Sequence, residues 1–241
     1  VSAGERFKQG DEVLGYVDLM QVGMTHAEYA AVPEAILAHK PATLSHVEAV
    51  TLPIGALTAY AALHKHGHIG AGSRVLINGA SGGVGTYALQ LGKLAGAHLT
   101  AVCSARSVEQ VRELGADEVR DYQTEAVLRR GDRFDVIFDV ANTLTFAQCR
   151  PYLSERGIYI ITDPFKDIWG LVRGWFGRQR SPYLMVLNSA TPDFLHLVDL
   201  TAQGKLRPIV GEVFGFQDIA AGFTCVASGR KSGGRVVVQM S

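Results

Sequence analysis

Glycines cluster in one short segment of the chain, Asn78-Gly79-Ala80-Ser81-Gly82-Gly83-Val84-Gly85, between a β-branched run and an amphipathic stretch. In a strand-to-helix turn of this kind, glycine lets the backbone approach a ligand, and the first N–H groups of the helix can bind an anion. The spacing fits a dinucleotide fingerprint with alanine in the first glycine position. The alternative is a tight turn without a ligand. The candidate pyrophosphate-binding residues are Ala80, Ser81, Gly82, Gly83, Val84 and Gly85.

The same segment also has the Gly-x-x-x-Gly-x-Gly spacing of short-chain dehydrogenases, through Gly79, Gly83 and Gly85. That family transfers a proton through a Tyr-x-x-x-Lys pair. No tyrosine of this chain has a lysine four residues later, so we exclude this interpretation.

The segment that follows the second predicted strand indicates which nicotinamide cofactor is bound. About 20 residues past the glycines, an acidic side chain would hydrogen-bond the adenosine ribose and select NAD. This chain has Val102-Cys103-Ser104-Ala105-Arg106 there, without a carboxylate. The Ser104 hydroxyl and the Arg106 guanidinium can bind a 2′-phosphate, so the sequence favours NADPH. The alternative is that Arg106 is a solvated surface charge.

The elements that must position these residues follow from the hydrophobic pattern. Apolar, β-branched runs alternate with amphipathic stretches, which is typical of a parallel sheet covered by helices on both faces. The strands are predicted over 74–78, 99–103, 134–140, 158–161 and 183–187. Helices are predicted over 83–96 and 107–114, the second with a capping box formed by Ser107 and Gln110. The fold class is α/β, with a Rossmann-type, doubly wound parallel sheet.

Both ends of the chain have a different pattern, with short strands separated by glycine, proline and histidine. These strands are predicted over 12–17, 27–32, 35–38, 208–214 and 234–239. A helix before the last strand would bury Ile219, Phe223 and Val226. We expect both ends to form one discontinuous β-rich domain. The predicted domains are 1–50 and 189–241 for this part and 51–188 for the Rossmann domain.

Composition narrows the class of partner and the compartment. Of 241 residues, 23 are Lys or Arg and 23 are Asp or Glu, so no basic field favours nucleic acid. Cys103, Cys149 and Cys225 lie far apart, which predicts free thiols in a reducing compartment and no metal site. No apolar run approaches the roughly 18 residues of a membrane span. We therefore expect a cytoplasmic protein.

The remaining metal candidate is the run His64-Lys65-His66-Gly67-His68. Residues two apart do not share a helix face, so a metal site there would need a loop. The favoured interpretation is a solvated helix C-terminus, where imidazolium charge suits the helix dipole.

Several blocks of the sequence resemble the medium-chain dehydrogenase/reductase superfamily, in its zinc-independent, quinone oxidoreductase-like branch. They are RFKQGDEV, LPIGALTAY, NGASGGVG, AVCSAR, RELGADEVRDY and FDVIFDV, and similar blocks run from residue 6 to the end. The resemblance implies a Rossmann coenzyme domain set within an incomplete catalytic domain made from both chain ends. It also implies that Ser104 and Tyr122 contact the 2′-phosphate, that Thr58 lies beside the nicotinamide and that Arg230 binds a cofactor phosphate.

The same resemblance implies the reaction. Zinc-dependent members carry a ligand cysteine where this chain has Ile54, so we expect hydride transfer from NADPH to a quinone or an α,β-unsaturated carbonyl without zinc. The alternatives are a zinc-independent alcohol dehydrogenase or carbonyl reductase and a non-catalytic NADPH-binding protein. The residues do not identify a catalytic acid. Full-length relatives carry a further N-terminal stretch, so we expect a fragment that binds NADPH but turns it over poorly.

Two segments bear on partners other than the small-molecule acceptor. The predicted strand 183–187 lies at the edge of the sheet, which favours a homodimer through strand pairing. Segment 167–180 mixes aromatic and basic residues, so one interpretation is that it contacts a membrane surface or nucleic acid. Because the net charge is zero, we favour a helix that covers the pocket mouth or a subunit interface.

Overall fold

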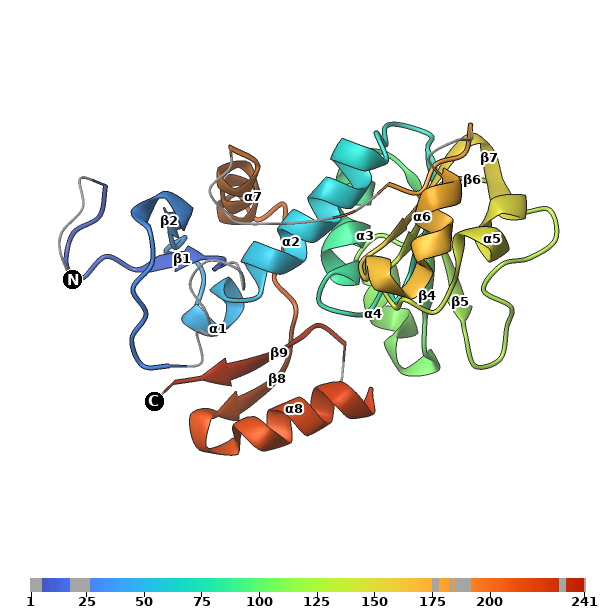
Figure 1. Cartoon of the computed structure of the whole chain (residues 1–241). Coiled ribbons are helices and arrows are strands. Elements are labelled where there is room, and N and C mark those ends of the chain that lie inside the picture. Colours follow the sequence, from blue (N-terminus) through green and yellow to red (C-terminus); the bar gives the residue numbers. More distant parts are fainter. Residues whose placement is uncertain are drawn as a thin grey trace. The chain divides into compact units, whose positions relative to one another are not determined.

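A computed structural model describes residues 6–17, 27–174, 178–182, 184, 192–229 and 233–240 of the chain (Figure 1). The chain divides into two compact units. The central unit comprises residues 58–185 and 232–234, and the terminal unit comprises residues 1–57, 186–231 and 235–241. Helix α2 (Leu52–Tyr60) spans the boundary between the units.

The central unit contains a five-stranded sheet and the segments that connect its strands. Its elements are η2 (Ala61–His66), β3 (Arg74–Asn78), α3 (Gly85–Leu94), β4 (His98–Cys103), η3 (Ala105–Ser107), α4 (Val108–Glu113), β5 (Glu118–Asp121), β6 (Phe134–Asp139), α5 (Phe146–Cys149), η4 (Arg150–Tyr152), β7 (Leu153–Ile161), η5 (Pro164–Asp167) and α6 (Ile168–Gly174).

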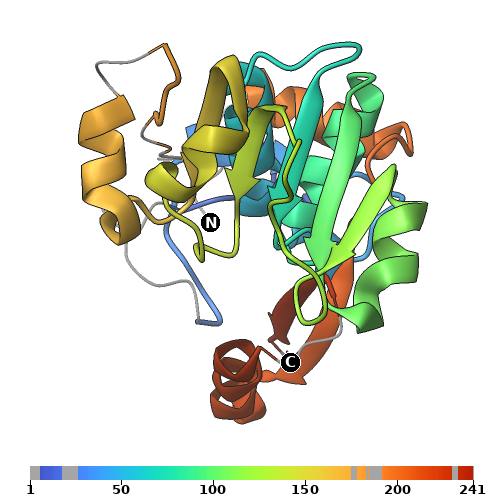
Figure 2. The same cartoon turned by 90° about the vertical axis from the view of Figure 1, so that its right-hand side faces the viewer.

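All neighbouring strands of this sheet are parallel, in the order β5-β4-β3-β6-β7. Figure 2 shows them side by side, with α4 next to β5 at one edge. The chain runs outward from β3 through β4 to β5, then returns to place β6 on the other side of β3. The direction of strand order therefore changes between β3 and β6, as in Rossmann folds. The predicted α/β class is confirmed.

The central strands are buried because helices pack on the sheet. Val75, Leu76 and Ile77 in β3 are fully inaccessible, as are the apolar residues 136–138 in β6. Such strands read as continuous apolar runs, and the predicted strands there agree with the structure to within one residue. Strand β5 was not predicted, because three of its four residues are charged. The strand predicted over 183–187 lies outside the described residues except for Leu184, which is buried.

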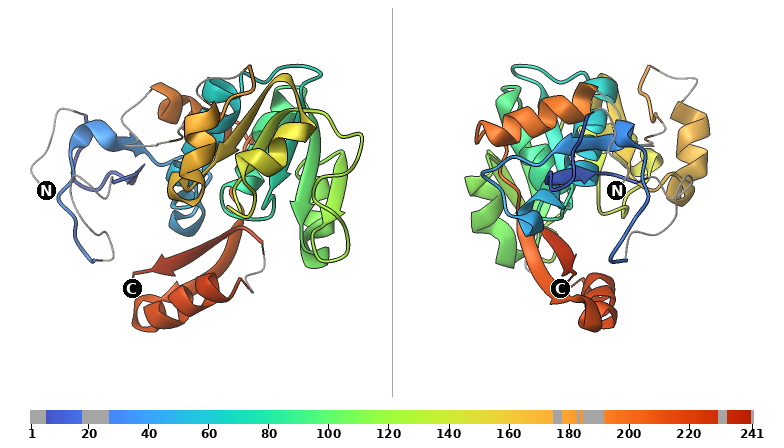
Figure 3. Two further views of the ribbon diagram at one scale, coloured as in Figure 1. Left: turned by 45° about the vertical axis from the view of Figure 1, so that its right-hand side comes forward. Right: turned by 90° about the vertical axis from the view of Figure 1, so that its left-hand side faces the viewer.

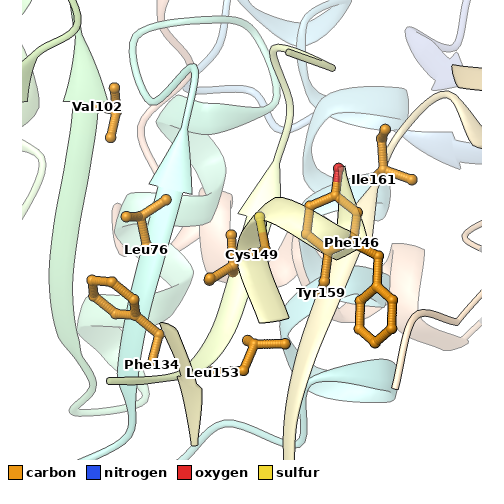
Figure 4. Packing of buried hydrophobic residues seen from close by; sticks show 9 residues of the cluster. Leu76, Val102, Phe134, Phe146, Cys149, Leu153, Tyr159 and Ile161 are labelled. Carbon is orange, nitrogen blue, oxygen red and sulfur yellow. The ribbon is translucent and has the colours of Figure 1, made fainter. Parts of the chain in front are cut away.

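A hydrophobic cluster joins α5 to the sheet (Figure 4). Phe146 and Cys149 of α5 pack with Tyr159 of β7, and the rings of Phe146 and Tyr159 lie 6.4 Å apart between centroids. Leu76 of β3 and Phe134 of β6 belong to the same cluster. The cluster therefore fixes α5 on the strands at the β6 and β7 side of the sheet.

The start of α4 lacks the capping box that the sequence predicted. The Ser107 side chain makes no capping hydrogen bond, because the chain enters α4 through the 3₁₀ turn η3 and the Ser107 N–H bonds to Ser104 O. The capping box predicted there is therefore wrong. Reciprocal capping boxes occur instead at Ser45 with Glu48 and at Thr145 with Gln148.

The terminal unit contains two small two-stranded sheets. Its elements are β1 (Val13–Gly15), η1 (Glu34–Ile36), β2 (Leu37–His39), α1 (His46–Ala49), α7 (Pro192–Ala202), β8 (Val210–Gly215), η6 (Phe216–Asp218), α8 (Ile219–Ser228) and β9 (Arg235–Gln239). Strands β1 and β2 are antiparallel, whereas β8 and β9 are parallel and α8 connects them. Figure 3 shows α8 beside this pair of strands. The strand predicted over 27–32 is wrong, since these residues form no strand.

Helix α8 presents an unexpected face to its sheet. Phe223 and Val226 were predicted to be buried but are 61% and 51% exposed. Gly222 is buried instead, and a Cβ built there would lie 3.4 Å from the ring of Phe214 in β8. The helix approaches the strand through its glycine, which leaves the larger side chains outside.

The helical stretch 46–66 has the length and composition of a membrane span, and it is the one such stretch among the described residues. Of its most apolar window, 61% is buried within the protein. A largely buried core helix passes the same test, so this stretch is weak support for a membrane span. The stretch ends in the π-helical turn η2, which places His66 at a helix C-terminus, as predicted. His66 is partly buried, however, and burial lowers its pKa, so the expected solvated imidazolium is not favoured there.

Two glycines in the turn between β3 and α3 should differ in how much stability the protein loses when each is replaced by alanine. A Cβ at Gly85 would lie 2.3 Å from Gly79 O and 2.7 Å from Ala80 C, and both are backbone atoms. We expect Gly85→Ala to lower the free energy of unfolding by about 1–3 kcal/mol. A Cβ at Gly82 would meet only Gly79 O, at 3.4 Å, so Gly82→Ala is the matched control.

Chemical denaturation of both variants checks this prediction. Equal stability of the two variants would show that the turn relaxes without cost and that the contact at Gly85 is not a constraint.

Candidate dinucleotide-binding site

The glycine segment forms the turn from β3 to α3 at the carboxyl edge of the sheet. Gly79 has a φ of +85°, and a Cβ there would lie 3.0 Å from Ala141 N, so the position requires glycine. The N–H groups of Gly79 and Ala80 both donate to Val102 O, at 3.1 and 3.0 Å. The turn is thereby tied to the end of β4.

The start of α3 has the features of an anion site. A helix N-terminus carries N–H groups without intrahelical partners and a partial positive charge. Thr86 Oγ1, in the first turn, is buried and has no hydrogen-bond partner within the described part of the chain. A Cβ at Gly82 would make only an ordinary contact with the protein, so packing does not require glycine at this position. A ligand that approaches the backbone closely would require it. These features fit a pyrophosphate.

The ends of β4 and β5 bring three further candidates to the same edge. Ser104 directly follows β4 and begins η3, which carries the exposed Arg106. Tyr122 directly follows β5, donates its N–H to Cys103 O at 3.2 Å and is 55% exposed. Because Cys103 pairs with Asp121 in the parallel register, Ser104 and Tyr122 lie at adjacent strand ends. The structure thus brings Ser104, Arg106 and Tyr122 to one region.

The carboxylate of Asp121, the last residue of β5, forms hydrogen bonds within its own turn. Asp121 accepts hydrogen bonds from Gln123 N at 3.0 Å and from the Thr124 hydroxyl at 3.4 Å. It therefore stabilises the turn after β5, and no carboxylate stands at the end of β4 itself.

The two remaining candidates are Thr58 and Arg230. Thr58 lies in α2 and is partly exposed, and Arg230 lies outside the described residues. Gly234, near Arg230 in sequence, donates its N–H to Ser81 O at 2.7 Å. Sequence reasoning missed this contact, because nothing in the pattern pairs a C-terminal glycine with the turn.

A buried polar network lies where β3 and β6 end side by side. Asn78 Nδ2 donates to Asp139 Oδ1 at 2.7 Å and to Thr143 Oγ1 at 2.8 Å. Asp139 Oδ2 accepts from Leu144 N at 2.8 Å and from the Tyr159 hydroxyl at 3.3 Å. Burial raises the pKa of Asp139 above its usual value, although these donors favour the carboxylate. The network fixes the loop after β6 beside the glycine turn.

A second network holds the segment after β5. The guanidinium of Arg120 forms two hydrogen bonds with Asp132, at 2.7 and 3.0 Å, and a third with Glu118 Oε1 at 3.0 Å. Burial opposes ionisation of Asp132, but Arg120 and the backbone N–H of Arg129 outweigh it and hold its pKa below the usual value. The chain between Asp121 and Asp132, which carries Tyr122, is therefore anchored at both ends.

Among the described residues, no group of three or more His, Cys, Asp or Glu side chains could hold a metal ion. Ile54, which stands where the family resemblance implies a ligand cysteine in zinc-dependent members, is partly exposed on α2. A cavity of about 720 Å³ lies away from the glycine turn, between α5, β7 and α6.

Known proteins with similar sequences are named as oxidoreductases. A family model described as zinc-binding dehydrogenase matches residues 114–238. The human mitochondrial NAD(P)H oxidoreductase RTN4IP1 is 36% identical over 96% of this chain and 65% of its own length. The chloroplast envelope quinone oxidoreductase homolog of Arabidopsis thaliana is 35% identical, over 87% of this chain and 67% of its own. The trans-enoyl reductase pgmF of Aspergillus terreus is 32% identical, over 99% and 71%.

Solved structures share the fold. The quinone oxidoreductase of Coxiella burnetii superposes with a TM-score of 0.87 at 24% identity, over 98% of this chain and 74% of its own. The chain belongs to the medium-chain dehydrogenase/reductase superfamily, among its quinone oxidoreductase-like members. It spans about two thirds of the length of RTN4IP1, 65%.

The comparisons correct one expectation. RTN4IP1 is a mitochondrial protein, and the quinone oxidoreductase homolog of spinach is chloroplastic. These relatives point to an organelle, so the predicted cytoplasmic location is wrong. Charge balance and dispersed cysteines are shared by many compartments and cannot separate them.

The Arg120 network predicts how stability depends on pH. Asp132→Asn removes one charge-assisted partner from a buried guanidinium, so the free energy of unfolding at pH 7 should fall by about 1.5–3 kcal/mol. Because the pKa of Asp132 is lowered in the folded protein, its contribution is present above the unfolded pKa of about 3.9. The difference from wild type should therefore shrink as the pH falls through the lower folded value.

Denaturation at several pH values measures this difference. Glu109→Gln, an exposed substitution in α4, is the control and should change stability little. A difference that persists unchanged in acid would contradict the proposed role of the Asp132 carboxylate.

Proposed function

We propose that this chain binds NADPH across the glycine turn and the ends of β4 and β5. The observation that carries the proposal is the pairing of an anion-type helix N-terminus with Ser104, Arg106 and Tyr122 at the same sheet edge. In this assignment, Ala80, Ser81, Gly82, Gly83, Val84 and Gly85 hold the pyrophosphate. Ser104, Arg106 and Tyr122 hold the adenosine 2′-phosphate. Thr58 and Arg230 remain candidates for the nicotinamide and a cofactor phosphate.

The proposed reaction is hydride transfer to a quinone or an α,β-unsaturated carbonyl. The names of the relatives, NAD(P)H oxidoreductase, quinone oxidoreductase and trans-enoyl reductase, support a small acceptor of this kind. The bound nicotinamide would supply the hydride, and the protein would orient the cofactor and exclude water. A solved alcohol dehydrogenase is also similar, with 26% identity and a TM-score of 0.78, so reduction of a carbonyl is the second candidate.

Two variants test the cofactor assignment. Gly82→Ala should fold normally and bind NADPH less tightly, because the added methyl group occupies the approach of the pyrophosphate. Arg106→Ala removes a charge-assisted contact worth about 1.5–3 kcal/mol, so the preference for NADPH over NADH should fall by about one to two orders of magnitude. Titration calorimetry with both cofactors measures each effect.

Arg130→Ala, which removes an exposed arginine after β5, is the matched control and should leave cofactor preference unchanged. Equal affinity of the wild-type protein for NADPH and NADH would refute the assignment. The reaction itself is tested by NADPH oxidation with panels of quinones and enones. Tight binding of NADPH without turnover of any acceptor would favour a non-catalytic NADPH-binding protein.

We also propose that the reaction needs no zinc, since Ile54 cannot ligate a metal and the cysteines are dispersed. Elemental analysis of protein purified without added metal should find substoichiometric zinc. Stoichiometric zinc that survives dialysis would overturn this part of the proposal. A homodimer through residues 183–187 stays a prediction, which sedimentation of the protein can check.

A further inference from the structure

A short helical segment of the central unit carries its large apolar side chains on the outside. Phe165, in η5, is 80% exposed, and Trp169 in α6 is 75% exposed. Ile168 and Val172 are 54% and 47% exposed. The spacing of these four residues is that of one helix face. Single exposed apolar residues are common, but a cluster of this size marks an interaction surface.

The inward side of the same helix is built from glycines. Gly170 and Gly174 are buried. A Cβ at Gly170 would lie 2.1 Å from Asp167 Oδ2, and one at Gly174 would lie 2.5 Å from Ser181 N. At Gly174 the helix backbone therefore lies directly against Ser181, and at Gly170 the space is filled by the Asp167 side chain that accepts the N–H of Gly170, so the larger side chains lie on the other face. The outward position of Trp169 and its neighbours is fixed by this packing.

Basic groups lie next to the apolar stripe. The cavity of about 720 Å³ is lined by Arg150, Arg173 and Arg178 together with Val172 of the stripe. Arg178 pairs with Glu155, whereas no carboxylate in the described part of the chain lies within ion-pair distance of Arg150 or Arg173. Figure 2 shows α6 at the margin of the central unit, on the β7 side.

The acidic side chains of the segment are engaged by backbone groups. Asp163 accepts the N–H of Phe165 at 3.1 Å. Asp167 accepts the N–H groups of Phe146 and Gly170, at 2.5 and 3.0 Å. They stabilise the turn into α6, and the Arg150 and Arg173 guanidinium groups remain to attract an anion.

The combination of exposed aromatic and aliphatic side chains with an arginine-lined hollow matches an anionic lipid surface. Interfacial helices insert such apolar side chains at the headgroup boundary, while lysine and arginine contact the phosphates. The zero net charge of the chain does not oppose this, because exposed charges act within about one Debye length, roughly 8–10 Å. For segment 167–180, net charge alone favoured a helix that covers the pocket mouth or a subunit interface. The local arrangement of apolar and basic side chains favours a lipid surface instead.

We propose that this surface, formed by Phe165, Ile168, Trp169, Val172, Arg150 and Arg173 and termed the α6 face, docks the protein on an anionic phospholipid bilayer. The apolar side chains enter the interface, and lipid phosphates meet the two arginines. The attachment is peripheral and reversible, since a single short helix buries little apolar area. It goes beyond the proposed reductase activity and does not depend on it.

Vesicle co-sedimentation of the full-length protein tests the proposal. The protein should bind phosphatidylcholine vesicles that contain phosphatidylglycerol, bind pure phosphatidylcholine vesicles much less, and dissociate as salt is raised. Trp169→Glu and the double variant Arg150→Glu/Arg173→Glu should each weaken binding roughly tenfold. Both change exposed side chains, and circular dichroism verifies that the variants are folded.

Two matched controls separate this surface from a general effect of charge. Leu195→Glu places an acid at an exposed apolar position of α7, and Arg130→Glu reverses an exposed arginine far in sequence from α6. Both should bind vesicles like the wild type. Absence of binding to anionic vesicles, or binding that Trp169→Glu leaves intact, overturns the proposal. A different result would point to a second copy of the chain as the partner: the wild type forms a dimer and binds no vesicles, and Trp169→Glu is a monomer. In that case the proposal is wrong.

Discussion

The hydrogen bond from Asn78 Nδ2 to Asp139 Oδ1 joins β3 to β6 at the one place where the strand order of the sheet reverses. Parallel sheets of this kind bind ligands at such a reversal, because the loops after the two strands diverge to opposite sides and leave a crevice. A buried carboxylate is costly unless donors surround it. Here the amide of Asn78, the backbone of Leu144 and the hydroxyl of Tyr159 supply them. The loops on both sides of the crevice are thus fixed by one buried group.

Backbone hydrogen bonds also join neighbouring strand ends at this edge of the sheet. The turn after β3 donates to Val102 O at the end of β4, and the loop after β6 donates through Val140 and Ala141 to Asn78 O. Each loop is therefore fastened to the neighbouring strand rather than to its own. A change in the strand register would displace the glycine turn, Ser104 and Ala141 together. The geometry of the candidate cofactor site is for this reason a property of the whole sheet edge.

The sequence was most informative where local and tertiary preferences agree. The glycine turn was predicted at its correct place because a buried strand, a ligand-type turn and an amphipathic helix follow each other within 21 residues, 74–94. Strand β5 was missed because its charged residues form the Arg120 network, which only the fold brings together. The polar pair Asn78 and Asp139 was also missed, although each ends an apolar run. The face that α8 presents to its sheet was predicted wrongly and that of α6 was not predicted, since periodicity does not say whether glycines or large residues face the protein.

The burial of two cysteines has a consequence for the chemical durability of the protein. Burial raises the pKa of Cys103 to about 11 and raises that of Cys149 further. Only the thiolate is nucleophilic, and at pH 8 about one Cys103 side chain in a thousand would be ionised. Quinones and enones are electrophiles that alkylate thiolates. A protein that binds such acceptors could be alkylated at any accessible thiolate. Burial of Cys103 and Cys149 keeps both sulfur atoms inert toward such compounds.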